Sequence, residues 1–103
     1  MNEQTKKVAI VTGSSRGIGA AIAKRLALDG FAIVINYAGS RDKAEEVVNQ
    51  IQFFGGDAIA VQGDVSKPKD VESLFDAAEH EYGGVDILVN NAGIQTQESY
   101  QYW

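Results

Sequence analysis

Four short apolar runs alternate along the chain with three segments whose apolar residues return at helical spacing. The runs are KVAIVTG, FAIVINY, DAIAVQGDV and VDILVNNAG, at residues 7–13, 31–37, 57–65 and 85–93. They show little polar alternation, which is typical of strands that are buried on both faces of a sheet. The pattern therefore predicts four strands.

The intervening segments predict three amphipathic helices. Their apolar positions are Ile18, Ile22, Leu26, Ala21, Ala23 and Ala27 in the first, Ala44, Val47, Val48 and Ile51 in the second, and Val71, Leu74, Phe75 and Ala78 in the third. We expect Ser40 and Ser66 to be the N-caps of the second and third helices, with Pro68 in the first turn of the third. Glycines at positions 30, 55 and 83 are expected to end the three helices.

Strands that alternate with helices pair in parallel, because each helix carries the chain back to the same end of the sheet. The predicted fold is therefore α/β, a Rossmann-type doubly wound parallel sheet that is truncated after the fourth strand. We assign residues 1–94 to this half-domain. Residues 95–103, QTQESYQYW, have neither an apolar period nor turn residues, and we interpret them as an irregular tail that is frameshifted or truncated.

The composition excludes several classes of partner. Hydrophobic residues form 45% of the chain and charged residues 22%, as in ordinary globular domains. The net charge of −5 comes with no basic cluster, so we expect neither nucleic acid nor a membrane as a partner. The chain has no cysteine, which excludes a thiolate metal site, and His80 stands between two glutamates as a solvated side chain. We predict a cytoplasmic chain without a metal site.

Ligands of doubly wound sheets bind at the carboxyl ends of the strands, where this chain has TGSSRGIG, NYAGS, GDVS and NNAG. The first of these places three glycines between a strand and a helix, with the spacing G-x-x-x-G-x-G. Such a loop keeps side chains away from a bound pyrophosphate, and the helix N-terminus attracts the phosphates. The candidate residues of this predicted dinucleotide site are Gly13, Ser14, Ser15, Arg16, Gly17, Ile18 and Gly19. A glycine-rich turn that binds nothing is the alternative.

The end of the second strand indicates which dinucleotide is bound. An acidic residue there would accept a hydrogen bond from the ribose 2′-hydroxyl of NAD and repel a 2′-phosphate. No carboxylate precedes Asp42 in this stretch, and Arg16 and Arg41 could reach a 2′-phosphate. We expect NADP rather than NAD as the cofactor, with ordinary surface charges as the alternative for both arginines. The candidate residues in this stretch are Asn36, Tyr37, Ala38 and Ser40.

TGSSRGIG, followed by GDVS and VDILVNNAG, resembles the short-chain dehydrogenase/reductase family, and within it the 3-oxoacyl-(acyl-carrier-protein) reductases. The resemblance covers Lys7 to about Ile94. It implies an oxidoreductase that transfers hydride between a nicotinamide cofactor and a carbonyl or alcohol substrate. Besides the glycine loop, the positions that it assigns to the cofactor are Asp64, Val65, Asn91, Ala92 and Gly93.

These positions have different implied roles. Asp64 would bind the adenine amino group, with backbone contacts from Val65, and residues 91–93 would line the ribose and nicotinamide side of the site. Asn90 is implied to be a structural tie within the sheet, where its amide can both donate and accept. For Asp64 the alternative is a helix-cap role shared with Ser66.

The catalytic part of the family's pattern is missing from the sequence. Family members carry a Tyr-x-x-x-Lys pair beyond NNAG, whereas this chain has Tyr100 and Tyr102 there and no lysine after Lys69. We therefore assign no catalytic residue and expect the chain alone to be inactive, with a carbonyl or alcohol substrate only if the catalytic half is supplied. Two functions stay open. One is a truncated NADP-dependent oxidoreductase, and the other is a non-catalytic nucleotide-binding or interaction fragment that self-associates through the exposed edge of its fourth strand.

Overall fold

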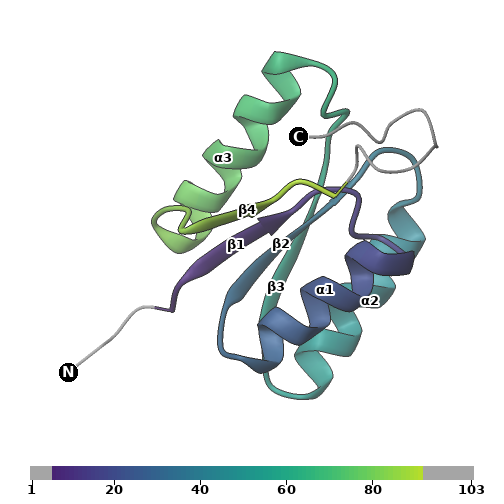
Figure 1. Ribbon diagram of the computed structural model, residues 1–103, viewed down its shortest axis with the longest axis vertical. Helices are drawn as coiled ribbons and strands as arrows, with labels where there is room; N and C mark the ends of the chain where they lie inside the picture. The colour runs from purple at the N-terminus through teal and green to yellow at the C-terminus, as the bar shows by residue number, and fades with distance from the viewer. Residues whose placement is uncertain (1–5, 92–103) are drawn as a thin grey trace.

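The computed structural model describes residues 6–91 of the chain and has the predicted alternation of strands and helices (Figure 1). The elements are β1 (Val8–Val11), α1 (Gly17–Leu28), β2 (Ala32–Tyr37), α2 (Arg41–Phe53), β3 (Asp57–Gln62), α3 (Pro68–Tyr82) and β4 (Ile87–Val89). The strands are equal to or shorter than the apolar runs at each end, because the runs include residues of the adjoining loops. The predicted site residues Ala92 and Gly93, and the predicted tail at residues 95–103, lie outside the described residues.

The four strands are parallel and lie in the order β3-β2-β1-β4. The first two crossovers lead outward from β1 to β2 and β3, and the third, through α3, returns to the other side of β1. Helices α1 and α2 cover one face of the sheet and α3 covers the other (Figure 1). The predicted doubly wound α/β fold is confirmed, and its strand order reverses between β1 and β4.

Two hydrophobic cores hold the helices on the sheet, because successive strand residues point to opposite faces. Ile35 belongs to the core under α1 and α2, whereas Val34 packs with Leu74 in the core under α3. Every residue of β1 and β2 is buried, as predicted for strands covered on both faces. At β4, which is an edge of the described sheet, Ile87 is 36% exposed and Leu88 is 47% exposed.

Helix α1 buries small residues most deeply against the sheet, while Ile22 and Leu26 pack partly buried against the same core, as the apolar spacing predicted. Its buried residues are Gly19, Ala20, Ala23 and Ala27. Ile18, which was predicted to face the core, is 72% exposed, and this prediction is wrong. Small side chains let the helix lie close to the strands, and this close approach leaves Ile18 at the outer edge of the first turn.

The helix boundaries follow the predicted glycines, but one predicted N-cap is wrong. Glycines in the left-handed conformation, with φ from 89° to 101°, end the helices at Gly30, Gly55 and Gly83. Ser40 stands at the predicted N-cap of α2, without a side-chain hydrogen bond to the helix. Helix α3 begins at Pro68 with Lys67 at the N-cap, not Ser66. The Ser66 hydroxyl instead donates to Asp64 Oδ1, 2.7 Å away, in the loop before the helix.

Candidate functional site

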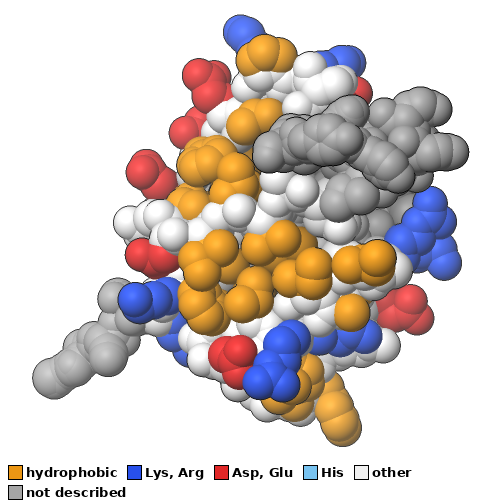
Figure 2. Space-filling model, viewed as in Figure 1, with side chains coloured by type: hydrophobic (Ala, Val, Ile, Leu, Met, Phe, Trp, Pro, Cys, Tyr) orange, Lys and Arg blue, Asp and Glu red, His pale blue; other side chains and the backbone are white. Residues whose placement is uncertain are grey.

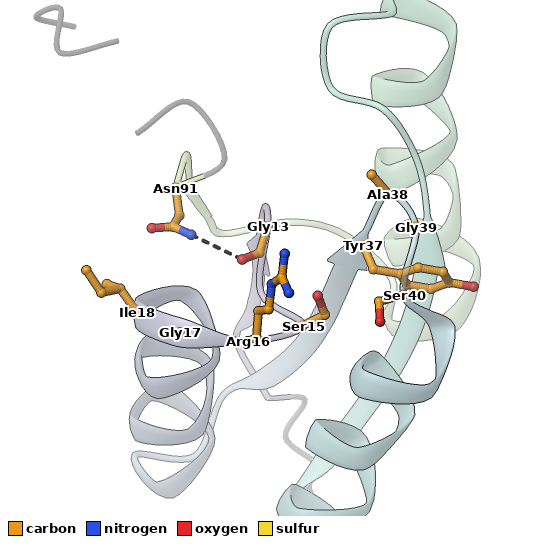
Figure 3. Close-up of a pocket in the computed structure, with 10 residues that line it drawn as sticks. All are labelled: Gly13, Ser15, Arg16, Gly17, Ile18, Tyr37, Ala38, Gly39, Ser40 and Asn91. Carbon is orange, nitrogen blue, oxygen red and sulfur yellow. Dashed lines mark hydrogen bonds between the residues drawn. The ribbon is translucent and has the colours of Figure 1, made fainter. Parts of the chain in front are cut away.

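An open cleft of about 650 Å³ lies at the carboxyl ends of β1 and β2, beside the N-terminus of α1 (Figure 3). The lining residues are Gly13, Ser15, Arg16, Gly17, Ile18, Tyr37, Ala38, Gly39, Ser40 and Asn91. All of them except Gly39 are candidates from the sequence. Gly39 has no side chain to suggest a contact, and only its place in the NYAGS stretch could have indicated it.

The loop between β1 and α1 has the backbone that its glycines were predicted to allow. Gly13 and Gly17 have φ of 60° and 63°, a conformation in which a residue with a Cβ is strained. A Cβ on Gly19 would collide with the Gly13 carbonyl oxygen and lie 2.6 Å from Asn91 Nδ2. No atom lies within 4 Å of the position of a Cβ on Gly17, so this part of the loop faces open space. Gly19 is therefore required for packing, and Gly13 and Gly17 for their conformation.

The start of α1 leaves backbone donors unused. Within residues 6–91, no group accepts a hydrogen bond from the N–H of Arg16, Gly17 or Ile18. No acidic side chain stands in the first turn of α1 to neutralise the positive end of the helix dipole. These donors border the cleft, and their arrangement suits an anion such as a phosphate group.

Ser14 and Asn36 lie beneath the cleft instead of on its surface. Ser14 is fully buried, and its Oγ donates to Val11 O at 2.6 Å and accepts from the Asn36 N–H at 3.0 Å. Asn36 is 2% exposed, and its Oδ1 accepts a hydrogen bond from the Gly13 N–H at 2.9 Å. Both side chains shape the glycine loop from below, and their direct contact with a cofactor stays a prediction.

Asn91 holds the same loop from the opposite side. Its Nδ2 donates to Gly13 O at 3.2 Å, the bond drawn in Figure 3, and its N–H donates to Thr12 Oγ1 at 2.8 Å. The Thr12 hydroxyl lies 3.4 Å from Asn90 Oδ1 and 3.3 Å from Val89 O, which matches the implied role of Asn90 as a structural tie. The end of β4 is therefore fastened to the start of the glycine loop.

The two arginines that the sequence suggests for binding a 2′-phosphate differ in their position relative to the cleft. Arg16 lines the cleft and forms no ion pair with a described residue, and Figure 3 shows its side chain extending from the glycine loop toward the turn after β2. Arg41 does not line the cleft, and its Nε donates to Glu45 Oε2 at 3.1 Å. That hydrogen bond and the charge of Glu45 raise the pKa of Arg41 above its ordinary value. The cleft lining contains no carboxylate, so the charge of Arg16 is not balanced there.

Asp64 and Val65 lie outside this cleft, in the loop between β3 and α3. The Asp64 carboxylate accepts hydrogen bonds from the Ser66 hydroxyl at 2.7 Å and the Ser66 N–H at 2.9 Å, and these bonds lower the pKa of the carboxyl. This turn precedes the N-cap of α3 and does not cap the helix. A smaller pocket of about 250 Å³ is lined by Thr12, Val65, Val71, Leu74, Phe75, Leu88 and Asn90. Contact of Asp64 and Val65 with a cofactor stays a prediction.

Residues 6–91 offer little support for other kinds of site. No three metal-binding side chains gather in this part of the chain, and His80 is exposed on α3. Among the described helices, none has the length and apolar character of a membrane span. The cleft beside α1 is therefore the ligand site with the most support.

The sequence matches the family model described as short chain dehydrogenase over residues 7–102. It is 53% identical over 89 residues to 3beta-hydroxysteroid dehydrogenase 1 of Eggerthella lenta, an alignment that covers 86% of this chain and 34% of the relative. It is 49% identical over 88 residues to a 3-oxoacyl-[acyl-carrier-protein] reductase of Staphylococcus epidermidis, with 85% of this chain and 36% of the relative covered. The expected resemblance to this family is confirmed.

Solved structures give the same result for the fold. A dehydrogenase/reductase from Sinorhizobium meliloti superposes with a TM-score of 0.84 at 46% identity, over 88% of this chain and 36% of that one. A short-chain dehydrogenase/reductase from Serratia marcescens gives a TM-score of 0.81 at 44% identity, over 84% of this chain and 36% of that one. The chain thus spans about a third of the length of the relatives that it matches.

Proposed function

The chain belongs to the short chain dehydrogenase family, and we propose that its cleft binds NADP as the cofactor-binding part of an oxidoreductase. The observation that carries this proposal is the Arg16 guanidinium, which forms no ion pair with a described residue. It lies beside N–H groups that have no acceptor within residues 6–91, in a cleft whose described lining has no carboxylate. A dinucleotide with an additional 2′-phosphate needs two anion sites, and these groups supply both.

The two anion sites are close together but are built differently. The N–H groups of Arg16, Gly17 and Ile18 would hold the pyrophosphate at the positive end of the α1 dipole. The open space above Gly17 leaves room for the phosphate oxygens. The Arg16 guanidinium and the Ser40 hydroxyl would hold the 2′-phosphate at the end of β2.

The remaining candidates would bind the other parts of the cofactor. One oxygen of the Asp64 carboxylate is bonded to Ser66, and the other has no partner among the described residues, which leaves it available to the adenine amino group. Val65 would add backbone contacts beside it. Asn91, together with residues 92–93, would line the ribose and nicotinamide side.

When it is bound, a nicotinamide supplies or accepts the hydride that interconverts a carbonyl and an alcohol. The described residues of this chain would bind and orient the cofactor, and the cleft lining that they form contains no lysine, histidine or carboxylate to move a proton in that reaction. We therefore propose that this chain alone does not turn over substrate.

A second candidate function is that of a nucleotide-binding interaction module. The observation that favours it is the apolar surface at β4, where Ile87 is 36% exposed and Leu88 is 47% exposed, and where Leu88 lines a small pocket together with Phe75 of α3. Figure 2 shows hydrophobic side chains gathered on the face that carries β4. An apolar edge strand of this kind is a template for pairing with another chain.

Titration of the purified chain with NADPH and with NADH, followed by nicotinamide fluorescence, tests the proposed cofactor. We expect NADPH to bind more tightly, and Arg16→Ala to narrow the preference by about 5- to 30-fold, since one charge-assisted hydrogen bond contributes about 1–2 kcal/mol. Arg25→Ala is the matched control, because Arg25 lies on the same helix but pairs with Asp29 outside the cleft. Equal affinity for both cofactors, or an equal effect of both substitutions, would contradict the proposal.

A further inference from the structure

The Asn36 side chain connects three loop segments without reaching the surface. It is 2% exposed, and its Oδ1 accepts from the Gly13 N–H at 2.9 Å. Its Nδ2 donates to Gly63 O at 3.1 Å and to Val61 O at 3.4 Å. The oxygen and both N–H bonds of the amide therefore have partners inside the protein, and a replacement must reproduce an acceptor on one side and a donor on the other.

The backbone of Asn36 adds two further bonds to the same loop. The Asn36 N–H donates to Ser14 Oγ at 3.0 Å, and the Asn36 carbonyl accepts from the Ser14 N–H at 2.9 Å. Asn91 holds the carbonyl of Gly13 from the other side, so this peptide segment is fixed at both ends while Gly13 keeps its positive φ. Asn36 is thus the residue with the most bonds to the start of the glycine loop among those described.

We infer that Asn36 is a positioning residue, which holds the glycine loop in its ligand-ready conformation and joins it to the loop after β3, without touching the ligand. The N–H donors of Arg16 and Gly17 reach the cleft because Gly13 turns the chain in the left-handed conformation. A loop fixed before binding needs no ordering when the ligand arrives, which increases affinity. Through Gly63 the same side chain sets the start of the segment that carries Asp64. The inference rests on the proposed function only for the identity of the ligand.

Asn36→Asp tests this role because it changes one donor and keeps the shape. A carboxylate still accepts from the Gly13 N–H, but it cannot donate to Gly63 O, and it faces two carbonyl oxygens in a buried site. Burial and these acceptors raise the pKa of the introduced carboxyl. The protonated acid can donate to Gly63 O, so this bond is present below the raised pKa and is lost as the pH rises through it, while the longer bond to Val61 O is absent at either pH.

The affinity for NADP⁺ would be measured by calorimetry at about pH 5.5 and about pH 8, on either side of the raised pKa expected for a buried carboxyl. We expect the affinity of Asn36→Asp to match that of the wild type at the lower pH and to fall at least about tenfold below it at the higher pH, as for a buried polar group left without its partner. The variant and the wild type share every other ionisable group, including Arg16, Asp64 and Asp70 near the segments that Asn36 joins, so the ratio of their affinities isolates the introduced carboxyl. Asn49→Asp, on the exposed side of α2, is the matched control and should follow the wild type at both pH values.

The backbone amide signal of Gly13 in a ¹⁵N–¹H spectrum of the ligand-free chain gives a second readout. In Asn36→Asp it should move away from its wild-type position as the pH rises and return on acidification. Equal affinity of variant and wild type at both pH values, or an equal loss at both, would overturn the inference. If circular dichroism shows that the variant unfolds at the higher pH, its affinity is compared with that of the wild type at the pH values below this transition, where the variant is still folded. A loss of affinity before unfolding supports the inference, and a loss that only accompanies unfolding overturns it.

Failure of the proposed function has a different signature. A wild-type chain that binds neither NADP⁺ nor NADPH would refute the proposed cofactor. The Gly13 amide signal alone would then test the positioning role of Asn36. A pH-dependent Gly13 signal in Asn36→Asp, absent from Asn49→Asp, would still support the positioning role. A Gly13 signal that does not respond would overturn it.

Discussion

Replacing Gly19 with alanine tests the packing of the glycine loop most directly. The added Cβ would collide with the Gly13 carbonyl oxygen and lie 2.6 Å from Asn91 Nδ2 and 2.9 Å from Ser14 Cα. Two of these three atoms belong to the backbone, so the loop itself must shift. Overpacking of this kind costs about 1–3 kcal/mol, and the higher helix propensity of alanine offsets at most about 1 kcal/mol. We therefore expect Gly19→Ala to lower the free energy of unfolding by about 1–2 kcal/mol.

Alanine substitutions at two other glycines distinguish the effect of a steric collision from the effect of backbone strain. Gly84→Ala is the neutral control, because no atom lies within 4 Å of the added Cβ and the φ of Gly84 is not in the left-handed region. Gly17→Ala also has open space, but its φ of +63° imposes strain of about 1–2 kcal/mol on a residue with a Cβ.

Urea denaturation followed by far-UV circular dichroism measures all three variants. With a slope of about 1–3 kcal/mol per molar urea, the midpoint of Gly19→Ala should fall by roughly 0.3–2 M relative to the wild type. Gly84→Ala should stay within about 0.5 kcal/mol of the wild type, as most surface substitutions do. Equal midpoints for Gly19→Ala and Gly84→Ala would refute the reasoning, since the predicted collision would then have no energetic consequence.

Ser66→Ala should raise the pKa of Asp64 toward its ordinary value, because the hydrogen bond from the Ser66 hydroxyl is the largest cause of the lowered pKa. A ¹³C titration of the Asp64 carboxyl measures this, and an unchanged pKa in the variant would contradict the prediction. The folded-state pKa of Asp64 is lower than its unfolded pKa of about 3.9, so its contribution to the free energy of unfolding is present above that value and is lost as the pH falls through the folded-state pKa. Acidification should therefore reduce the difference in stability between the wild type and Ser66→Ala. Leu88→Lys should weaken concentration-dependent self-association of the chain, measured by sedimentation, whereas Leu28→Lys, at an exposed leucine of α1, should not. Identical association of the two variants would exclude the β4 surface as the interface. The chain alone should consume no NADPH with ketones or oxoacyl thioesters, because general acid catalysis contributes about 10²–10⁴-fold and the described lining of the cleft has no lysine, histidine or carboxylate to support it. Turnover above a buffer control that Gly17→Trp abolishes would show that this expectation is wrong.

The order and type of the described elements could be predicted from apolar spacing, because buried strands and amphipathic helices have different periods. Predictions from local patterns were wrong where a residue fits the sequence pattern but a different local arrangement is adopted in the fold. Ile18 fits the helical period, but the buried residues of α1 are Gly19 and three alanines, and Ile18 is exposed in the first turn. Ser66 is a good N-cap by type, but its hydroxyl bonds to the Asp64 carboxylate instead.

The glycine loop could also be predicted, since its three glycines stand between a strand and a helix. The direction of Asn36 could not, because it depends on groups far away in the sequence. Its Oδ1 meets the N–H of Gly13 and its Nδ2 meets the carbonyl of Gly63, and no local pattern brings these partners together. A polar residue at the end of a strand therefore indicates a site, but not whether the residue touches the ligand or the loop that does.

The attachment of β4 links local opening of the sheet to occupancy of the cleft. β4 has three residues, pairs with β1 in the described sheet, and ends at Val89, whose carbonyl accepts from the Thr12 N–H at 3.0 Å. Short edge strands open more often than the rest of a domain, and such an opening would release Asn91 from Gly13 while Asn36 keeps its hold. A ligand that needs both bonds binds only the closed form, so it must slow the exchange of the β4 amides with solvent. The amide protons of this strand would therefore report the saturation of a site to which the strand contributes no side chain of its own.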